Sequence, residues 1–352
     1  MKNKKYFHGL RWLPALAIAA SLNTATAQIT INANQTATQL AQTLAGASVT
    51  VSNATLNCPG VANGTFTVTS SNLGLDAGVL LTSGSAAFAN TPNPSNSNGV
   101  AGDADLTALA LVPTNDACIL QFDFVPLSDS VKFQYVFGST EYQSYTCSSF
   151  SDVFGFFISG PGISGPFSNN AKNIALVPGT TCPVGVNTIN GSSATNCGNF
   201  TPPCTNNGMY FINNIGGTTV GYNGFTTVLT AQSAVTPNQT HHMKLAIADG
   251  TDFILDSGVW LKAASLTSAT TTVTHCGPYT WPISGATYSA SGIYYYTAPG
   301  STQLNILDLT IYCPNTVPTI SEWGLIILCL LSLSIGMVFI YKRQRALSAN
   351  KA

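Results

Sequence analysis

Acidic side chains recur at short spacing in several segments of this 352-residue chain. Two of them are separated by one residue near position 104, and three aspartates follow one another closely near position 250. The full set is Asp103, Asp105, Glu141, Asp152, Asp249, Asp252 and Asp256. Clustered carboxylates on loops suit Ca²⁺, which takes roughly six to eight oxygen ligands. We therefore expect a calcium site formed by convergence of these residues in three dimensions, since the chain has no EF-hand spacing.

The same residues allow other interpretations. Aspartate often caps turns through its side chain, which is the structural alternative for this set. Glu141 and Asp152 also have the residue types of a glycoside hydrolase pair, although no further catalytic pattern accompanies them. His241 and His242 are adjacent on a predicted strand and point to opposite faces, which favours structural roles. The chain contains no nucleophile elbow, P-loop or dinucleotide-binding fingerprint.

The N-terminus has the layout of a secretory signal peptide. A positively charged start is followed by an apolar stretch over residues 12–20 and a run of small residues. That stretch is much shorter than the roughly 20 residues that cross a bilayer. We expect a signal peptide over residues 1–27, with Ala25 and Ala27 read by signal peptidase and Gln28 as the first mature residue.

The C-terminus predicts a membrane-spanning helix. Residues 323–341 are uncharged and long enough to cross a bilayer, and Lys342, Arg343 and Arg345 follow at once. The positive-inside rule then places the tail, ending with residues 346–352, on the cytoplasmic side. A buried core helix is the alternative.

The residues just before this helix add a short motif, which consists of Pro318, Thr319, Ser321, Glu322, Trp323 and Gly324. Together with the helix and the basic residues, the segment 317–345 resembles the IPTL-CTERM sorting signal, with Val317 where isoleucine is usual. The resemblance implies a membrane sorting peptidase of the exosortase kind as a partner. The plain alternative is that Pro318 starts the helix and Trp323 lies at the membrane interface.

Charge is distributed unevenly along the chain. Residues 28–322 contain four lysines and no arginine against all 13 acidic residues, a net charge of −9. Without a basic stripe the chain cannot follow a phosphate backbone, so we expect no nucleic acid partner.

Cysteine usage fits an oxidising compartment. Apart from one residue in the predicted membrane helix, an even number of cysteines occurs: Cys58, Cys118, Cys147, Cys182, Cys197, Cys204, Cys276 and Cys313. Such a set in an exported protein predicts disulfides. Cys276 and Cys313 bracket a short region and are expected to pair, whereas the spacing leaves the pairing of the other six open.

Hydrophobic patterning predicts a mainly β protein. One short helix is expected over residues 36–44, and about ten short strands follow, punctuated by Gly, Pro, Asn and Ser. The clearest strand alternates Val131, Phe133, Tyr135 and Phe137 on one face. This pattern favours one antiparallel β-sandwich or jelly-roll-like domain over residues 28–266. Loop-rich regions at 90–102 and 180–207 interrupt it, and disulfides are expected to hold the second, which could not pack by itself.

A second module is expected over residues 270–314. Tyrosine, isoleucine and leucine alternate there with small polar residues, as in a compact β unit. This segment resembles a tyrosine-rich repeat of bacterial surface proteins, and the resemblance implies that it is a spacer or stalk. The Tyr294–Tyr296 run is expected to pack as a strand, with stacking on sugars as the alternative.

Several motifs of the main domain match one known family in order. They occupy residues 64–84, 102–106, 116–142, 150–162, 173–180, 222–231 and 241–265. This succession resembles the choice-of-anchor L domain, a family of bacterial surface modules joined to varied C-terminal anchors. The resemblance implies the architecture and carries no established chemistry.

Two functions remain open at this point. The favoured one is a non-catalytic surface protein at the bacterial cell envelope, anchored at its C-terminus, that binds a glycan, matrix component or surface protein and is braced by calcium. The alternative is a secreted hydrolase held at the envelope. Scarce histidine and absent arginine in residues 28–322 favour the first, because substrate-handling sites often use these residues.

Overall fold

The computed structural model describes residues 28–46, 49–127, 129–216, 219–268, 271–282, 284–296, 305–313 and 320–349. The expected signal peptide, residues 1–27, lies outside this range, as do Pro318 and Thr319 of the sorting motif. The chain divides into two compact units, residues 1–268 and residues 269–352.

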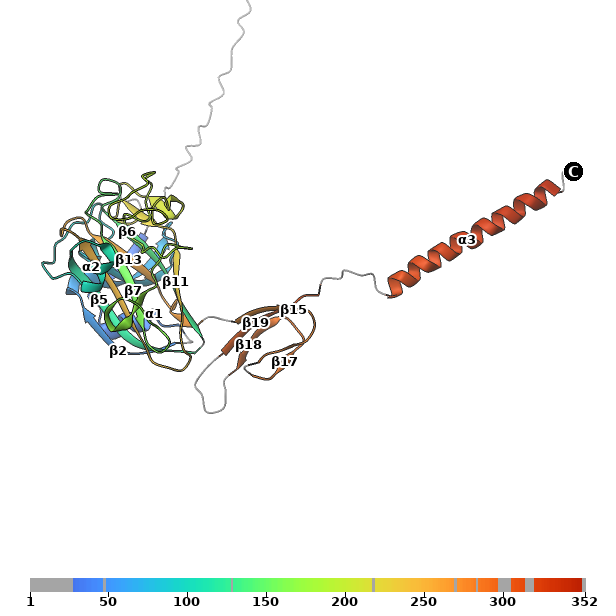
Figure 1. Ribbon diagram of the computed structural model, residues 1–352, viewed down its shortest axis with the longest axis horizontal. Coiled ribbons are helices and arrows are strands. Elements are labelled where there is room, and N and C mark those ends of the chain that lie inside the picture. Colours follow the sequence, from blue (N-terminus) through green and yellow to red (C-terminus); the bar gives the residue numbers. More distant parts are fainter. Residues whose placement is uncertain are drawn as a thin grey trace, which may run out of the picture. The chain divides into compact units, whose positions relative to one another are not determined.

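Two antiparallel sheets form the first unit (Figure 1). The nine-stranded sheet has the order β1 (Gln28–Ala33), β3 (Asn63–Ser70), β4 (Ala77–Thr82), β13 (Ser257–Lys262), β6 (Ser130–Ser139), β10 (Gly224–Thr226) and β9 (Phe211–Asn213), with β11 (Leu229–Ala234) and β14 (Thr267–Ser268) also paired to β6. The five-stranded sheet has the order β2 (Val49–Asn57), β5 (Thr114–Pro126), β12 (His241–Gly250), β7 (Val153–Ser159) and β8 (Lys172–Asn173).

An aromatic layer joins the two sheets face to face. The four alternating residues of β6 are fully buried, as the sequence pattern predicts. Tyr135 lies 5.1 Å from Phe154 and 5.0 Å from Phe156 between ring centroids, which joins β6 of one sheet to β7 of the other. Phe137 stacks on Phe154 at 5.7 Å. The predicted mainly β sandwich is therefore confirmed.

Both sheets are also covered on their outer faces. Helix α2 (Ala104–Ala110) and Phe167 cover the outer face of the five-stranded sheet near Phe157. Part of the outer face of the nine-stranded sheet is covered by loop residues that pack on Trp260 and Tyr222. Strands such as β7, buried at every position, therefore lack the alternation of a half-exposed strand.

Helix α1 (Ala37–Leu44) begins and ends where the sequence predicts. Thr36 and Gln39 form a capping box, in which the Thr36 hydroxyl accepts from the Gln39 N–H and the Gln39 side chain accepts from the Thr36 N–H. Leu40 and Leu44 are buried in the main core. Helix α2 was not foreseen in the sequence, because its seven residues are too few to show a helical period. Single-turn 3₁₀ helices occur at Gly60–Ala62, Ala86–Phe88, Ser168–Asn170 and Gly208–Tyr210.

Three disulfides lie in the first unit. Cys58 pairs with Cys118, Cys147 with Cys197, and Cys182 with Cys204. The last two hold the region 180–207 as expected, and this region also contributes Val184, Val186 and Ile189, all fully buried, to the main core. Isolated apolar residues in a polar loop show no period, which is why the sequence concealed them.

The second unit contains a small β module and a long helix. One sheet has the order β15 (Thr271–His275), β19 (Asn305–Ile311) and β18 (Gly292–Tyr296), with β15 parallel to β19, and β16 (Tyr279–Thr280) pairs with β17 (Thr287–Tyr288). Cys276 and Cys313 form its disulfide. Tyr288 and Tyr294 stack at 3.8 Å and pack with Trp281 in the core of the module, whereas Tyr295 is exposed.

Helix α3 (Ile320–Ala349) contains the expected membrane segment. Its stretch Gly324–Arg345 is long and apolar enough to cross a membrane, and none of it is buried against the rest of the protein. Exposed leucine, isoleucine and phenylalanine along this stretch distinguish it from a core helix.

Candidate functional site

The seven acidic residues singled out from the sequence form two groups in the fold. Asp103 and Asp105 lie at the start of α2, against the outer face of the five-stranded sheet. The other five lie on segments at the ends of β6, β7, β12 and β13. Among the described residues, no group of three or more His, Cys, Asp or Glu side chains is arranged to hold a metal ion. The seven expected ligands are therefore divided between two places in the fold, and calcium binding by any of them stays a prediction.

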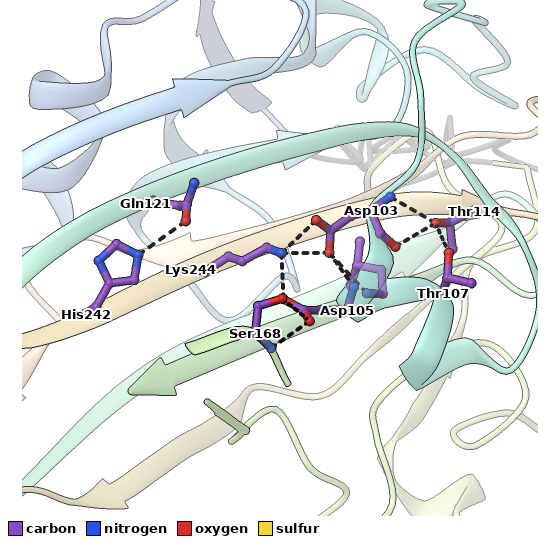
Figure 2. Close-up of polar contacts among 9 residues, drawn as sticks. Asp103, Asp105, Thr107, Thr114, Gln121, Ser168, His242 and Lys244 are labelled. Atoms are coloured by element: carbon purple, nitrogen blue, oxygen red, sulfur yellow. Dashed lines mark hydrogen bonds and ion pairs between the residues drawn. The ribbon is translucent and has the colours of Figure 1, made fainter. Parts of the chain in front are cut away.

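Lys244 of β12 neutralises the first group (Figure 2). Its Nζ lies 2.6 Å from Asp103 Oδ2 and 2.8 Å from Asp105 Oδ2. Asp103 also caps α2 by accepting from the N–H groups of Asp105 and Leu106. Ser168 donates to Asp105 from its N–H and its hydroxyl. This group joins α2 to β12 and has a cation of its own.

The electrostatics of this group follow from those contacts. Burial raises the pKa of Asp105, but the hydrogen bonds from Lys244 and Ser168 outweigh it and leave the pKa below its ordinary value. Lys244 Nζ also lies over the Phe157 ring, 5.4 Å from its centre, which is a cation–π contact. Asp103 and Asp105 thus have structural roles, as the alternative interpretation of the acidic residues predicts.

The second group has a buried core of carboxylates, for which we use the name acidic array. Its members are Asp116, Glu141, Asp152, Asp249 and Asp256, each at most 1% exposed. Asp116 was missed from the sequence, although it opens one of the matched motifs. Its backbone has a positive φ of 53°, which no sequence pattern reveals.

Most carboxylates of the acidic array accept hydrogen bonds. Asp116 accepts from the Ser97 hydroxyl and from the N–H groups of Asn98 and Val100. Asp152 accepts from the Gly250 N–H at 3.0 Å and from the Ser257 hydroxyl.

Two further carboxylates accept from backbone N–H groups, and the Ser85 N–H is also near Asp256 and favours its charged form. Glu141 accepts from the Asp152 N–H at 3.0 Å, and Asp256 Oδ1 accepts from the Asn96 N–H at 2.7 Å. All these donors favour the ionised form of the acceptor.

Three carboxylate oxygens of the array have no hydrogen-bond partner. They are both oxygens of Asp249 and Oδ2 of Asp256, all of them buried. The Ser83 hydroxyl is near Asp249 and favours its charged form, without forming a hydrogen bond of acceptable geometry. A buried polar atom without a partner is costly, so these three oxygens call for an explanation.

The pKa values in the array shift in one direction. Burial raises the pKa of Glu141 to about 8, and the charge of Asp252 adds to the rise. Burial also raises the pKa of Asp256 to about 6. The pKa values of Asp152 and Asp249 rise through burial and through the neighbouring carboxylates. Burial and the neighbouring carboxylates thus act together to favour the neutral form of these groups.

Asp252 lies at the edge of the array and is partly exposed. Its Oδ1 accepts from the Ile254 N–H at 3.1 Å, which is a turn cap. A depression of about 130 Å³ opens beside it, lined by Glu141, Tyr145, Phe150, Asp252, Ile254 and Leu255. Asp152 is fully buried, so Glu141 and Asp152 do not present two carboxylates to one sugar ring.

The two adjacent histidines do point to opposite faces. His241 is buried against the Phe124 ring, 5.6 Å away, and its Nδ1 contacts the Gln239 carbonyl oxygen. His242 is partly exposed, and its Nδ1 lies 2.8 Å from Asp123 Oδ1. Its other ring nitrogen faces Gln121, as Figure 2 shows.

A groove of about 640 Å³ lies on the outer face of the nine-stranded sheet, where the loop cover ends. Its lining residues are Lys132, Gln134, Thr230, Gln232, Lys262, Ala263, Ala264, Ser265 and Thr267. Lys132 stands opposite Gln232 on one neighbouring strand and opposite Thr267 on another. No acidic residue lines this groove, which we call the lysine groove.

Comparison with known proteins identifies the main domain. A model of the choice-of-anchor L domain matches residues 28–267. The chain belongs to the choice-of-anchor L domain family. No curated protein and no solved structure is matched.

The choice-of-anchor L domain thus contains three features: the acidic array, the lysine groove and the cluster of Asp103, Asp105 and Lys244, which we call the Lys244 group. The small β module and α3 lie beyond the matched residues. Membership of the family indicates a cell-surface protein. An apolar C-terminal helix able to cross a membrane is consistent with that location.

Proposed function

We propose that this chain is a non-catalytic surface protein of the bacterial cell envelope that binds an acidic glycan through the lysine groove. In this proposal the chain is exported and signal peptidase removes residues 1–27. An exosortase-like enzyme then reads the 317–345 segment while α3 holds the protein at the membrane.

The lysine groove supports this proposal by its chemistry. It combines two ammonium groups, two amides and several hydroxyls, which donate hydrogen bonds to carboxylate and hydroxyl oxygens. Its volume of about 640 Å³ lies within the range of ligand-binding clefts. No aromatic ring lines it, so a sugar would be held by charge and hydrogen bonds and not by stacking.

The floor of the groove is fixed by the backbone. Lys132 and Gln134 point outward from β6, because the alternate residues Val131, Phe133 and Tyr135 fill the core. Ser265 ties the rim together: its hydroxyl accepts from the Gln134 N–H and donates to the Lys262 carbonyl oxygen. A preformed groove loses little conformational entropy when a ligand binds.

The charge of the exported part makes the groove selective. Residues 28–322 carry a net charge of −9, yet two of their four lysines lie in this groove. A polyanion is repelled by most of the surface and attracted here. This contrast predicts binding that weakens as salt rises.

The experiment compares binding of the full chain in detergent to polygalacturonate and to neutral dextran. We expect binding to polygalacturonate only, and a loss of about tenfold in affinity, or about 1.4 kcal/mol, in the double variant Lys132→Gln, Lys262→Gln. Lys172→Gln changes a lysine of the other sheet, outside the groove, and should leave binding unchanged. Equal binding to dextran, or an unaffected double variant, would refute the proposal.

A hydrolase has one observation in its favour. Glu141 lines a depression and its pKa is raised to about 8 by burial, as in a general acid. Asp152 is enclosed by Gly250 and Ser257 and offers no second group to a substrate. Glycosidase or protease turnover by the full chain that Glu141→Gln abolishes would establish the hydrolase instead.

A further inference from the structure

We propose that the partnerless carboxylate oxygens of Asp249 and Asp256 bind a divalent cation within the acidic array, with Ca²⁺ as the best fit. The site goes beyond the glycan-binding function and does not depend on it. It lies at the end of the sandwich where the loops after β6, β12 and β4 meet.

The first argument is the state of Asp249. This residue is fully buried, and neither of its carboxylate oxygens accepts a hydrogen bond. Three carboxylates surround it closely enough to act on it electrostatically, those of Asp256, Asp116 and Glu141. A buried carboxylate among other carboxylates is expensive unless a positive charge joins it.

The second argument is that the neighbours are held as acceptors. Asp116 receives three donors, and Asp152 receives an N–H and a hydroxyl. An N–H group can only donate, so the Asn98 and Val100 N–H groups hold the Asp116 carboxylate as an acceptor. Asp116 is one of the carboxylates whose charge acts on Asp249.

The third argument is that the protein offers no cation here. Of the four lysines in residues 28–322, Lys244 pairs with Asp103 and Asp105, and Lys132 and Lys262 line the lysine groove. Lys172 belongs to β8, which pairs with β7 away from its Asp152 end. An ion from solution is the remaining source of positive charge.

The chemistry of the ligand atoms indicates which cation fits the site. The array consists of oxygen ligands, which suit hard cations, and it contains no histidine or cysteine as Zn²⁺ prefers. Because no three side chains form a ready cage, backbone oxygens and water must complete the shell. Ca²⁺ tolerates such irregular shells better than Mg²⁺, which demands an octahedron.

The backbone around the site is shaped closely to these side chains. A Cβ on Gly84 would lie 1.7 Å from Asp256 Oδ2, one of the partnerless oxygens. Asn98 donates to the carbonyl oxygens of Ser83 and Gly84 and holds this turn in place. Gly84 thus leaves the space that the Asp256 carboxylate occupies.

The test uses the full chain in detergent, with Ca²⁺, Mg²⁺ or EDTA. We expect Ca²⁺ at a hundredfold excess over its Kd to raise Tm by roughly 5–10 °C relative to EDTA, and Mg²⁺ to have a smaller effect. Tb³⁺ serves as a direct probe, because Tyr222 lies near Asp256 and Asp249 and can sensitise its luminescence. Ca²⁺ should displace it.

Two variants separate a site from a general loss of stability. Asp249→Asn should abolish the Ca²⁺-dependent rise in Tm and the Tb³⁺ signal, while its Tm in EDTA equals or exceeds that of the wild type, since a repelling charge is gone. Asp103→Asn removes a carboxylate that lies outside the array and should keep both responses. A wild type indifferent to Ca²⁺ and Tb³⁺, or responses lost in Asp103→Asn and kept in Asp249→Asn, would overturn the proposal.

Discussion

Asp103 and Asp249 have the same side chain in opposite surroundings. Asp103 contacts an ammonium group and caps a helix, whereas Asp249 is enclosed among carboxylates and accepts no hydrogen bond. Lys244 and Asp249 belong to the same strand, β12, but Lys244 meets Asp103 at the start of α2, whereas Asp249 lies near the end of the strand beside Asp256, Asp116 and Glu141. A short acidic motif therefore has a role that depends on its three-dimensional neighbours.

Lys244→Met tests the Lys244 group at this scale. We expect a loss of about 3 kcal/mol in the free energy of unfolding near neutral pH, because the buried Asp105 and the partly buried Asp103 lose their partner. Chemical denaturation of the full chain in detergent measures it. Lys172→Met, the same change at a partly exposed position, should cost much less.

The loss should also depend on pH. The pKa of Asp105 is lowered in the folded protein, so its contribution is complete above the unfolded value of about 3.9 and disappears as the pH falls through the folded value. The difference between Lys244→Met and the wild type should therefore shrink at about pH 2.5. A difference that stays constant over this range would contradict the ion-pair role.

An aromatic layer between β6 and β7 connects the two sheets. Phe156 contacts Phe133 and Tyr135 of the opposite sheet and Phe154 of its own strand. This layer fixes the distance between the sheets, and the strand ends that carry the acidic array are positioned by it. A substitution in this aromatic layer should therefore lower the free energy of unfolding more than it changes the acidic array.

Phe156→Ala should reduce the free energy of unfolding by about 3–5 kcal/mol, from lost burial and the cavity left behind. Phe88→Ala deletes the same atoms from a half-exposed residue and should change it by less than about 0.5 kcal/mol. Chemical denaturation with the disulfides intact compares the two. Similar losses in both variants would show that the layer is not the main core.

At the scale of the whole molecule, the question is how the protein is held at the cell surface. The choice-of-anchor L domain and the small β module each have their own core and disulfides, and α3 has neither. Its apolar residues are exposed along the stretch that is long enough to span a bilayer. These features of α3 are consistent with membrane anchoring.

Cell fractionation tests this anchoring. The full chain should sediment with membranes, and a chain ending after Cys313 should be soluble. Changing Lys342, Arg343 and Arg345 to glutamine keeps the apolar stretch and should keep sedimentation, since these residues set orientation. Recovery of the truncated chain with membranes would contradict the role of α3.

Mass spectrometry of the mature protein from its own cell tests processing. We expect Gln28 at the N-terminus and loss of the residues that follow the motif Pro318–Gly324. An intact C-terminus would leave α3 as the final anchor and remove the need for a sorting enzyme.

Sequence by itself determined the class of fold, the helix α1 and the apolar C-terminal helix. These features rest on local regularities: the alternation in β6, the Thr36 cap and an uncharged stretch of bilayer length. Local patterns survive in any tertiary context that buries one face or one segment. The family resemblance of the main domain was also visible in the order of its motifs.

Tertiary structure alone decided which acidic residues meet. The sequence could not separate Asp105 from Asp249, because Lys244 is 139 residues from Asp105 and because Asp116 and Glu141 also come to Asp249 from distant segments. Asp116 was missed because its unusual backbone angle leaves no sequence pattern. The lysine groove likewise depends on β6 lying beside β11 and β14. Sheet pairing brings distant residues together, and charge acts through space and not along the chain.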